Sequence, residues 1–271
     1  MCAMQTPTTP AHETYRRLAP FYDELTRDHD YDGWTRHLEQ AALRYGVRGR
    51  RLLDAACGTG KSFIPFLERG YEVTGCDISP EMLAVASAKA PGADLFAADV
   101  RELGHVGEFD LITCLDDAVN YLTGDGDLDL AFASFARNLA EDGVFVFDLN
   151  SVATYRTTWA RDATLESPEL FLAWCGRTGE GFEPGGVAEL IVEAFRETSA
   201  GVYERVTSHH LERHHPRPAV ERALAGAGLA AVGVFGLLPD GSLDTVALAD
   251  EDLHHKLVYF AQRFAEGGDT E

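Results

Sequence analysis

The chain has 271 residues, 45% of them hydrophobic, and a formal net charge of −21 at pH 7. This length and apolar content allow one domain with a large buried core and an embellishment. Because affinity for nucleic acid depends on Lys and Arg that neutralise phosphates, the acidity excludes DNA, RNA and anionic membranes as expected partners.

The N-terminal residues 1–12 are rich in Thr and Pro, and we expect them to be disordered. They lack the charged n-region and apolar h-region of an export signal, and no run of 18 apolar residues marks a membrane span. The five cysteines form no C-x-x-C pair, which argues against zinc and disulfide frameworks. We therefore predict a cytoplasmic protein, and we leave a homodimer open as its assembly.

Apolar residues recur at helical spacing from Glu13 to Tyr45, with one polar interruption at residues 27–30. This pattern predicts two helices, which we place over the ligand site described next. Tyr15 and Tyr22 lie seven residues apart, or two helical turns, so both rings are expected on one face.

The most informative segment joins two strands through a turn of small residues. The apolar strand 51–54 runs into a turn in which Gly58 and Gly60 remove the side chains that would keep a ligand from the backbone. A second strand ends on Asp77, 17 residues after Gly60, where a carboxylate can accept both hydroxyls of a ribose. The pattern predicts half of a nucleoside-binding site.

Two other nucleotide motifs overlap this turn and fit it less well. The third glycine of a dinucleotide fingerprint would fall at Phe63, whose ring would obstruct a pyrophosphate. A Walker A loop ending at residues 60–62 would need glycine in place of Ala55, and Asp54 would repel a triphosphate. We therefore expect neither a nicotinamide or flavin site nor nucleotide hydrolysis.

Strand and helix segments then alternate along the chain. Helices are expected over residues 62–69, 81–89 and 128–139, and strands over 72–77, 95–97, 109–114 and 143–148. With the first strand these make five parallel strands of a doubly wound α/β sheet, in which ligands bind at the carboxyl edge.

The alternation of strands and helices stops in residues 151–215. Segments 170–177 and 187–214 are rich in β-formers and alternate apolar with polar side chains, which predicts a small inserted antiparallel sheet over the ligand pocket. Residues 216–271 return to the main sheet with a helix over 218–227 and strands over 229–237 and 256–264.

The order L-L-D-x-A-C-G-T-G from Leu52, G-x-D at Gly75 and a third acid at Asp99 resembles the class I methyltransferases that depend on S-adenosylmethionine (SAM). The resemblance extends from about residue 15 to residue 150, and more weakly to the C-terminus. It implies SAM as the cofactor and a Rossmann-like sheet of seven strands, closed by an antiparallel pair. Residues 13–150 would form the SAM-binding core with its helical lid.

The resemblance also implies roles for individual side chains. Asp54 would lie near the amino-acid end of SAM, Asp77 would bind the ribose, and Asp99 the adenine edge. Ile78 and Met82 would pack against the adenine, although core packing explains both equally well. The cofactor-binding residues that we predict are Tyr15, Tyr22, Asp54, Ala56, Gly58, Gly60, Asp77, Ile78, Met82, Asp99, Val100 and Leu115.

Two segments resemble small-molecule N-methyltransferases, including those that act on amino sugars in antibiotic pathways. In these enzymes N-terminal tyrosines, as in residues 15–23, cover cofactor and acceptor, and phenol faces attract a sulfonium or ammonium. After the fourth strand, D-x-x-N-Y-L at residues 117–122 resembles their acceptor motif. The predicted catalytic residues are Tyr22, Tyr121, Asp116 and Asp117, of which one aspartate is expected only to cap a helix.

Methyl transfer from a sulfonium requires mainly positioning and exclusion of water. An aspartate at 116 or 117 would balance a cationic amine or accept its proton. We therefore predict metal-independent methylation of a small-molecule amine, with O-methylation and a catalytically inactive SAM-binding protein left open. His210, Glu212 and His214 share one face of a strand, which we interpret as a polar strand exit and not a metal site.

Overall fold

The computed structural model describes residues 11–167, 170–179 and 181–264. Within these ranges no helix is long and apolar enough to cross a lipid bilayer. The segment predicted to be disordered lies outside the described residues up to residue 10. Ala11 and His12 begin the helix α1 (Ala11–Leu18), so the boundary predicted at residue 12 is wrong, and Glu13 favours this start because its charge lies in the first turn.

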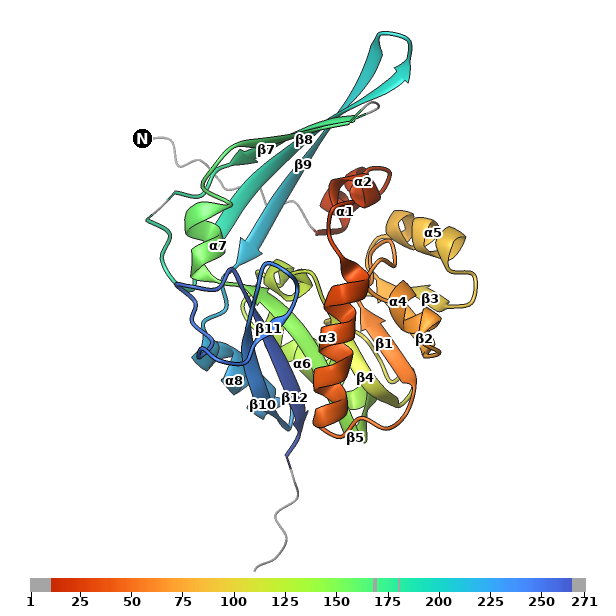
Figure 1. The fold of residues 1–271 in the computed structure, drawn as a ribbon, viewed down its shortest axis with the longest axis vertical. Coiled ribbons are helices and arrows are strands. Elements are labelled where there is room, and N and C mark those ends of the chain that lie inside the picture. The colour runs from red at the N-terminus through yellow and green to blue at the C-terminus, as the bar shows by residue number, and fades with distance from the viewer. Residues whose placement is uncertain (1–10, 168–169, 180, 265–271) are drawn as a thin grey trace, which may run out of the picture.

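An eight-stranded sheet forms the centre of the molecule, in the order β11-β10-β12-β5-β4-β1-β2-β3 (Figure 1). The five predicted parallel strands are neighbours, which confirms the doubly wound α/β fold. They are β3 (Asp94–Ala97), β2 (Glu72–Asp77), β1 (Arg51–Ala55), β4 (Phe109–Cys114) and β5 (Leu139–Asn150).

The C-terminal strands close the sheet as the resemblance implied. The strand β12 (Lys256–Arg263) pairs antiparallel with both β5 and β10 (Leu229–Leu237). All seven predicted strands are present. The eighth is β11 (Leu243–Asp244), a strand of two residues on the edge of β10, too short to leave a periodic signal in the sequence.

Helices cover both faces of this sheet. One face carries α3 (Tyr31–Arg44), α4 (Ile64–Glu68) and α5 (Pro80–Lys89), and the other carries α6 (Asp127–Asn138) and α8 (Arg217–Gly226). Each set packs its apolar side chains on the central strands as a separate core. Because the central strands are buried on both faces, their apolar residues do not alternate with exposed ones, and the polar Asp54 and Thr113 are buried with them.

The N-terminal region has three helices where two were predicted, because α2 (Tyr22–Leu25) is separate from α1. Pro20 lacks a backbone N–H and disfavours the helical conformation in Ala19, so the chain turns between the two helices. Tyr15 and Tyr22 therefore do not share one helix face, which corrects that expectation. The turn nevertheless brings their rings together edge to face, with the centroids 6.1 Å apart.

A second, four-stranded antiparallel sheet arches over α1 and α2 (Figure 1). Its strands are β6 (Ala163–Glu166), β7 (Leu170–Gly176), β8 (Val187–Ser199) and β9 (Val202–Arg213), and the helix α7 (Val152–Thr157) precedes them. Sequence patterns identified the last three strands but missed β6 and α7, which are only four and six residues long.

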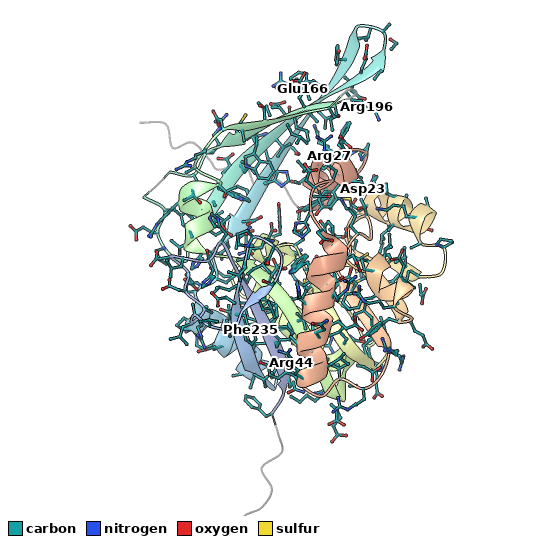
Figure 2. The ribbon with its side chains drawn as sticks, viewed as in Figure 1. Asp23, Arg27, Arg44, Glu166, Arg196 and Phe235 are labelled. Atoms are coloured by element: carbon teal, nitrogen blue, oxygen red, sulfur yellow. The ribbon has the colours of Figure 1, made fainter. Side chains whose placement is uncertain are left out.

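The inserted sheet rests on the N-terminal helices through apolar contacts. Leu18 and Phe21 are buried in one cluster with Leu190 and Val192 of β8. Arg196 of β8 lies over the Phe21 ring, 5.2 Å from its centroid, and projects toward α2 (Figure 2). The sheet and α1 therefore form one packed unit above the carboxyl edge of the main sheet.

The turn after β1 depends on Gly60. Its φ of +87° is a left-handed conformation, and a Cβ at this position would lie 2.7 Å from Cζ of Phe63, whose ring is fully buried. Glycine is thus required by the backbone conformation and by the close packing of the ring.

We predict that Gly60→Ala destabilises the protein by about 1–3 kcal/mol, because the side chain meets both strain and a clash. Thermal unfolding followed by circular dichroism should show a loss of about 2–4 °C per kcal/mol. Gly104→Ala is the control, since a Cβ there meets no atom within 4 Å. Equal melting temperatures for Gly60→Ala and the parent would contradict this account of the turn.

Candidate functional site

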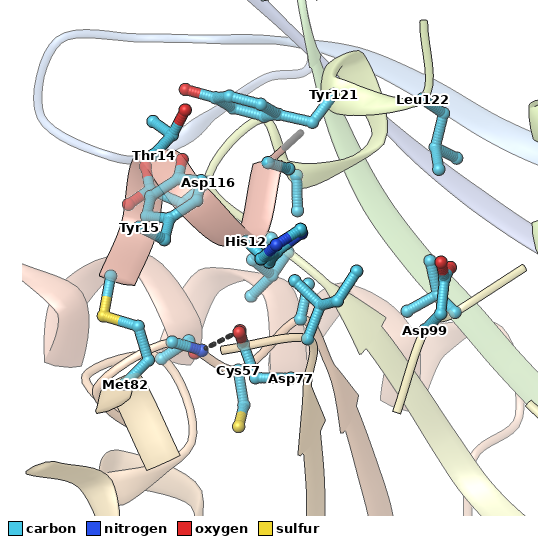
Figure 3. A pocket seen from close by; sticks show the side chains of 18 of the residues that line it. His12, Thr14, Tyr15, Cys57, Asp77, Met82, Asp99, Asp116, Tyr121 and Leu122 are labelled. Carbon is cyan, nitrogen blue, oxygen red and sulfur yellow. Dashed lines mark hydrogen bonds between the residues drawn. The ribbon is translucent and has the colours of Figure 1, made fainter. Parts of the chain in front are cut away.

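A cavity of about 380 Å³ opens at the carboxyl edge of the main sheet, beneath α1 (Figure 3). Its lining includes residues of α1, α2, α3 and α5, of the loops after β1 to β4, and Leu211 of β9. The predicted site residues that line it are Tyr15, Tyr22, Ala56, Gly58, Asp77, Ile78, Met82, Asp99, Val100, Leu115, Asp116 and Tyr121. Three predicted residues, Asp54, Gly60 and Asp117, are not part of this lining.

Asp77 presents a prearranged carboxylate at the end of β2 (Figure 3). Its Oδ2 accepts the backbone N–H of Gly58 at 2.8 Å and its Oδ1 accepts that of Ser79 at 2.8 Å. Burial raises the pKa of Asp77, while the two amides oppose this by favouring the charged form. Since each oxygen keeps further lone pairs, Asp77 can still accept hydroxyl groups of a ligand in the cavity.

Asp54 lies behind the cavity wall, with 1% of its surface exposed. Ser62 and Thr113 each donate a hydroxyl hydrogen bond of 2.6 Å to its carboxylate, which ties the turn after β1 to β4. Burial raises the pKa of Asp54 to about 6. A direct contact between Asp54 and the cofactor stays a prediction.

The predicted adenine acid, Asp99, has an arginine partner that the sequence analysis missed. Arg101 donates to both carboxylate oxygens of Asp99 through Nε and Nη2, and these bonds hold the pKa of Asp99 below its usual value. Nη1 of Arg101 also reaches Asp127 at 3.1 Å. An acid and an arginine only two residues apart in the sequence could have indicated this ion pair.

In the part of the chain that the structure describes, three residues other than glycine have a left-handed backbone: Ala56 with φ 56°, Asp116 with φ 62° and Asp117 with φ 56°. They follow β1 and β4, at the edge where the cavity opens. Such conformations cost roughly 1–3 kcal/mol each and need compensating contacts. Asp148 of β5 supplies such contacts to the second and third of these residues, because its carboxylate accepts the backbone N–H of Asp116 at 2.6 Å and of Asp117 at 3.1 Å.

Lys256, the first residue of β12, completes this cluster and was missed by the sequence analysis. Its Nζ lies 2.6 Å from Asp117 Oδ1, 2.8 Å from Asp148 Oδ2 and 3.4 Å from Asp116 Oδ1. Asp117 is also the residue before the short 3-10 helix η1 (Ala118–Tyr121), but its side chain makes no capping hydrogen bond. The expectation that one aspartate of the pair caps a helix is therefore wrong, because Lys256 binds the Asp117 carboxylate.

Asp116 joins the cluster to the N-terminal tyrosines. Its Oδ2 accepts the hydroxyl of Tyr22 at 2.8 Å and that of Tyr31 at 2.7 Å. Burial alone would raise the pKa of Asp116, but Lys256 and the Tyr31 hydroxyl hold it below its usual value. An ionised carboxylate with this many donors is a weak proton acceptor, so Asp116 supplies negative charge and orientation.

A second set of contacts fastens α2 to the glycine-containing turn. Asp23 accepts the Thr59 hydroxyl and forms an ion pair of 2.6 Å with Lys89 of α5 (Figure 2). Nζ of Lys61 donates to the backbone oxygen of Thr26 at 2.7 Å. The lysine that overlapped a Walker A pattern thus holds the helical cover in place.

The histidines at the end of β9 and just after it contact different partners. Nδ1 of His210 lies 2.7 Å from the Tyr121 hydroxyl, and His214 pairs with Glu251 at 3.2 Å. The described part of the chain contains no group of three or more His, Cys, Asp or Glu side chains placed to hold a metal ion. That the reaction needs no metal stays a prediction.

Known proteins share this architecture. A family model described as "Methyltransferase domain" matches residues 52–143. YqeM of Bacillus subtilis (strain 168), a methyltransferase by its name, is 31% identical over 79% of this chain and 85% of its own length. A dTDP-3-amino-3,6-dideoxy-alpha-D-glucopyranose N,N-dimethyltransferase of Streptomyces fradiae is 28% identical over 78% of this chain and 83% of its own length. The crystal structure of a SAM-dependent methyltransferase from Clostridium acetobutylicum ATCC 824 superposes with a TM-score of 0.76. The two chains are 26% identical, and the match covers 92% of this chain and 98% of the other.

We predict that Asp23→Ala loosens the helical cover, because it removes both the Thr59 contact and the Lys89 ion pair. Amide hydrogen exchange of the ligand-free protein should become several-fold faster in residues 11–31, while exchange in the central strands stays unchanged. Asp28→Ala is the matched control, since the Asp28 side chain is 84% exposed. Unaltered exchange in the Asp23 variant would show that other contacts hold α2.

Proposed function

We propose that this chain, which belongs to the SAM-dependent methyltransferases, transfers the methyl group of SAM to an amine nitrogen of a small molecule. The observation that carries the proposal is the composition of one cavity. Its cofactor side has the buried carboxylate of Asp77 on two backbone amides, and its opposite side has a tyrosine cluster around the ionised Asp116.

SAM, the cofactor of the family, fits the first side. Asp77 would accept the ribose hydroxyls, and the open space at Gly58, where a Cβ would meet no atom within 4 Å, leaves room for close approach to the backbone. Ile78 and Met82 also line the cavity. Asp99, held by Arg101, would present its remaining lone pairs near the adenine edge.

The second side suits a positive charge. The Tyr15 ring lies edge-on to Tyr22 at 6.1 Å and to Tyr121 at 5.2 Å between centroids, and all three line the cavity. Aromatic faces and the ionised Asp116 attract a sulfonium and an ammonium. The inserted sheet contributes Leu211 to this cavity, which supports its predicted place above the acceptor.

The protonation states favour nitrogen over oxygen as the acceptor atom. A hydroxyl must lose a proton to a base, whereas a neutral amine attacks a sulfonium methyl without one. Here Asp116 is already saturated with donors, burial lowers the pKa of His210 to about 3, and burial keeps the Tyr121 phenol protonated by raising its pKa. None of these three groups is therefore a strong general base.

The acceptor class follows from the relatives. The Streptomyces fradiae relative methylates, by its name, an amino group on a nucleotide-linked deoxysugar. We therefore propose an amino sugar of this kind as the first acceptor to test. A cytoplasmic location and a homodimer stay predictions.

We predict that Asp77→Asn weakens SAM binding at least tenfold, since a hydrogen bond to a charged acceptor contributes about 1.5–3 kcal/mol. Isothermal titration calorimetry with SAM and S-adenosylhomocysteine measures the effect. Asp94→Asn, an exposed position at the start of β3 and away from the carboxyl edge of the sheet, serves as the control. An unchanged dissociation constant for Asp77→Asn would remove the ribose assignment.

We predict that the protein converts dTDP-3-amino-3,6-dideoxy-α-D-glucopyranose and SAM to an N-methylated sugar. Turnover should increase with pH, because only the deprotonated amine has a lone pair for attack. EDTA should leave the rate unchanged. Mass-spectrometric fragmentation locates the new methyl group. A methyl on oxygen would instead support the O-methyltransferase alternative, and SAM binding without turnover of any amine or alcohol would support an inactive binding protein.

A further inference from the structure

The inserted sheet reaches the cavity wall through a buried histidine. His210 of β9 is 5% exposed, and its Nδ1 lies 2.7 Å from the hydroxyl oxygen of Tyr121. Its Nε2 lies 3.1 Å from Oγ of Ser208 on the same strand. The Tyr15 ring stands edge-on to His210, with the centroids 5.9 Å apart. Both ring nitrogens therefore have a hydroxyl partner, and one of these hydroxyls belongs to a residue that lines the cavity.

We propose that His210 is a positioning residue that makes the Tyr121 hydroxyl a hydrogen-bond acceptor toward the substrate amine. In this arrangement the phenol donates its proton to Nδ1, and Nε2–H donates to Ser208. The lone pairs of the phenol oxygen then face the cavity. The inference rests on the proposed amine chemistry and adds to it the residue that sets the polarity of Tyr121.

The surroundings keep both partners uncharged. Burial, followed by the nearby His209, lowers the pKa of His210 to about 3, so the imidazole has one donor and one acceptor nitrogen. Burial also raises the pKa of Tyr121, and Tyr15, Glu212 and Asp117 act in the same direction by their charges. A protonated phenol beside a neutral imidazole can direct its proton to the acceptor nitrogen, to the neighbouring Tyr15 hydroxyl or into the cavity, and the distance of 2.7 Å to Nδ1 favours the first.

The direction of this hydrogen bond decides what the amine can do. A phenol that donated into the cavity would bind the nitrogen lone pair, which must instead attack the methyl carbon. A phenol that accepts takes an N–H of the amine and leaves the lone pair in line with the sulfonium. The nitrogen–carbon bond then forms as the carbon–sulfur bond breaks, the electron pair stays on sulfur, and the proton remains on the ammonium product.

The strand itself supplies a matched control. Because side chains alternate along β9, His210 points to the buried face while His209 points to the other face, where its Nδ1 lies 3.7 Å from Glu189. A substitution at His209 therefore tests the loss of a histidine ring on the same strand without touching Tyr121.

Nuclear magnetic resonance tests the hydrogen-bond direction without any acceptor. Long-range ¹H–¹⁵N spectra of the full chain, with the spectrum of His210→Gln for assignment, report the tautomer of each histidine. His210 should show the neutral Nε2–H form at every pH from 5 to 8. An Nδ1–H tautomer, or titration of His210 within this range, would overturn the inference whatever the protein methylates.

Kinetics with dTDP-3-amino-3,6-dideoxy-α-D-glucopyranose then test the consequence. Tyr121→Phe and His210→Phe should each lower kcat about tenfold, which corresponds to one lost hydrogen bond. The double variant should lose no more than either single one, because both act through the same bond. His209→Phe should keep the parent kcat, and all four variants should keep the parent affinity for SAM.

Two further variants guard against a folding defect. His210→Gln provides a carbonyl oxygen that can accept from Tyr121, so it should recover part of the kcat lost in His210→Phe. If His210→Phe does not fold, Ser208→Ala, which frees Nε2 and weakens the tautomer preference, should lower kcat by a smaller factor. Multiplied losses in the double variant would overturn the positioning role. A parent enzyme that methylates no amine would overturn the proposed function, and the spectra would still decide the tautomer.

Discussion

A buried ion cluster at the carboxyl edge of the sheet determines the geometry of the site. The Asp148 carboxylate accepts two backbone N–H groups from the left-handed turn at residues 116–117 and binds Nζ of Lys256. One side chain thereby joins β4, β5 and β12. Removal of one member of such a cluster leaves the others buried and unpaired, at a cost of about 3–5 kcal/mol. The strained turn is stable because these tertiary contacts hold it.

The same turn shapes the side of the cavity where we propose that the acceptor binds. It directs Asp116 Oδ2 to the hydroxyls of Tyr22 and Tyr31, and it begins the helix η1 that carries Tyr121. The cofactor side is organised separately, by Asp77 on the amides of two loops. The two sides meet only when β1, β2 and β4 lie next to one another in the sheet.

All three lysines of this strongly acidic chain serve the site. Lys61 and Lys89 hold α2 over the turn after β1, and Lys256 neutralises part of the negative charge in the turn that contains Asp117. Their charge offsets carboxylates that would otherwise repel one another in a confined space. The three lysines thus hold the N-terminal helices and the acidic turn at residues 116–117 in place.

Local sequence determined the strands, the glycine-containing turn and Asp77, because side-chain period, turn conformation and the acid at a strand end are properties of neighbouring residues. Short elements such as β6 and β11 left no periodic pattern, and Pro20 changed how Tyr15 and Tyr22 meet. Only the tertiary structure decided the partners of the acceptor-side residues. Asp117 meets Lys256 across 139 residues and Tyr121 meets His210 across 89. Such contacts depend on strand order and on the placement of the inserted sheet, and no spacing within one segment encodes either.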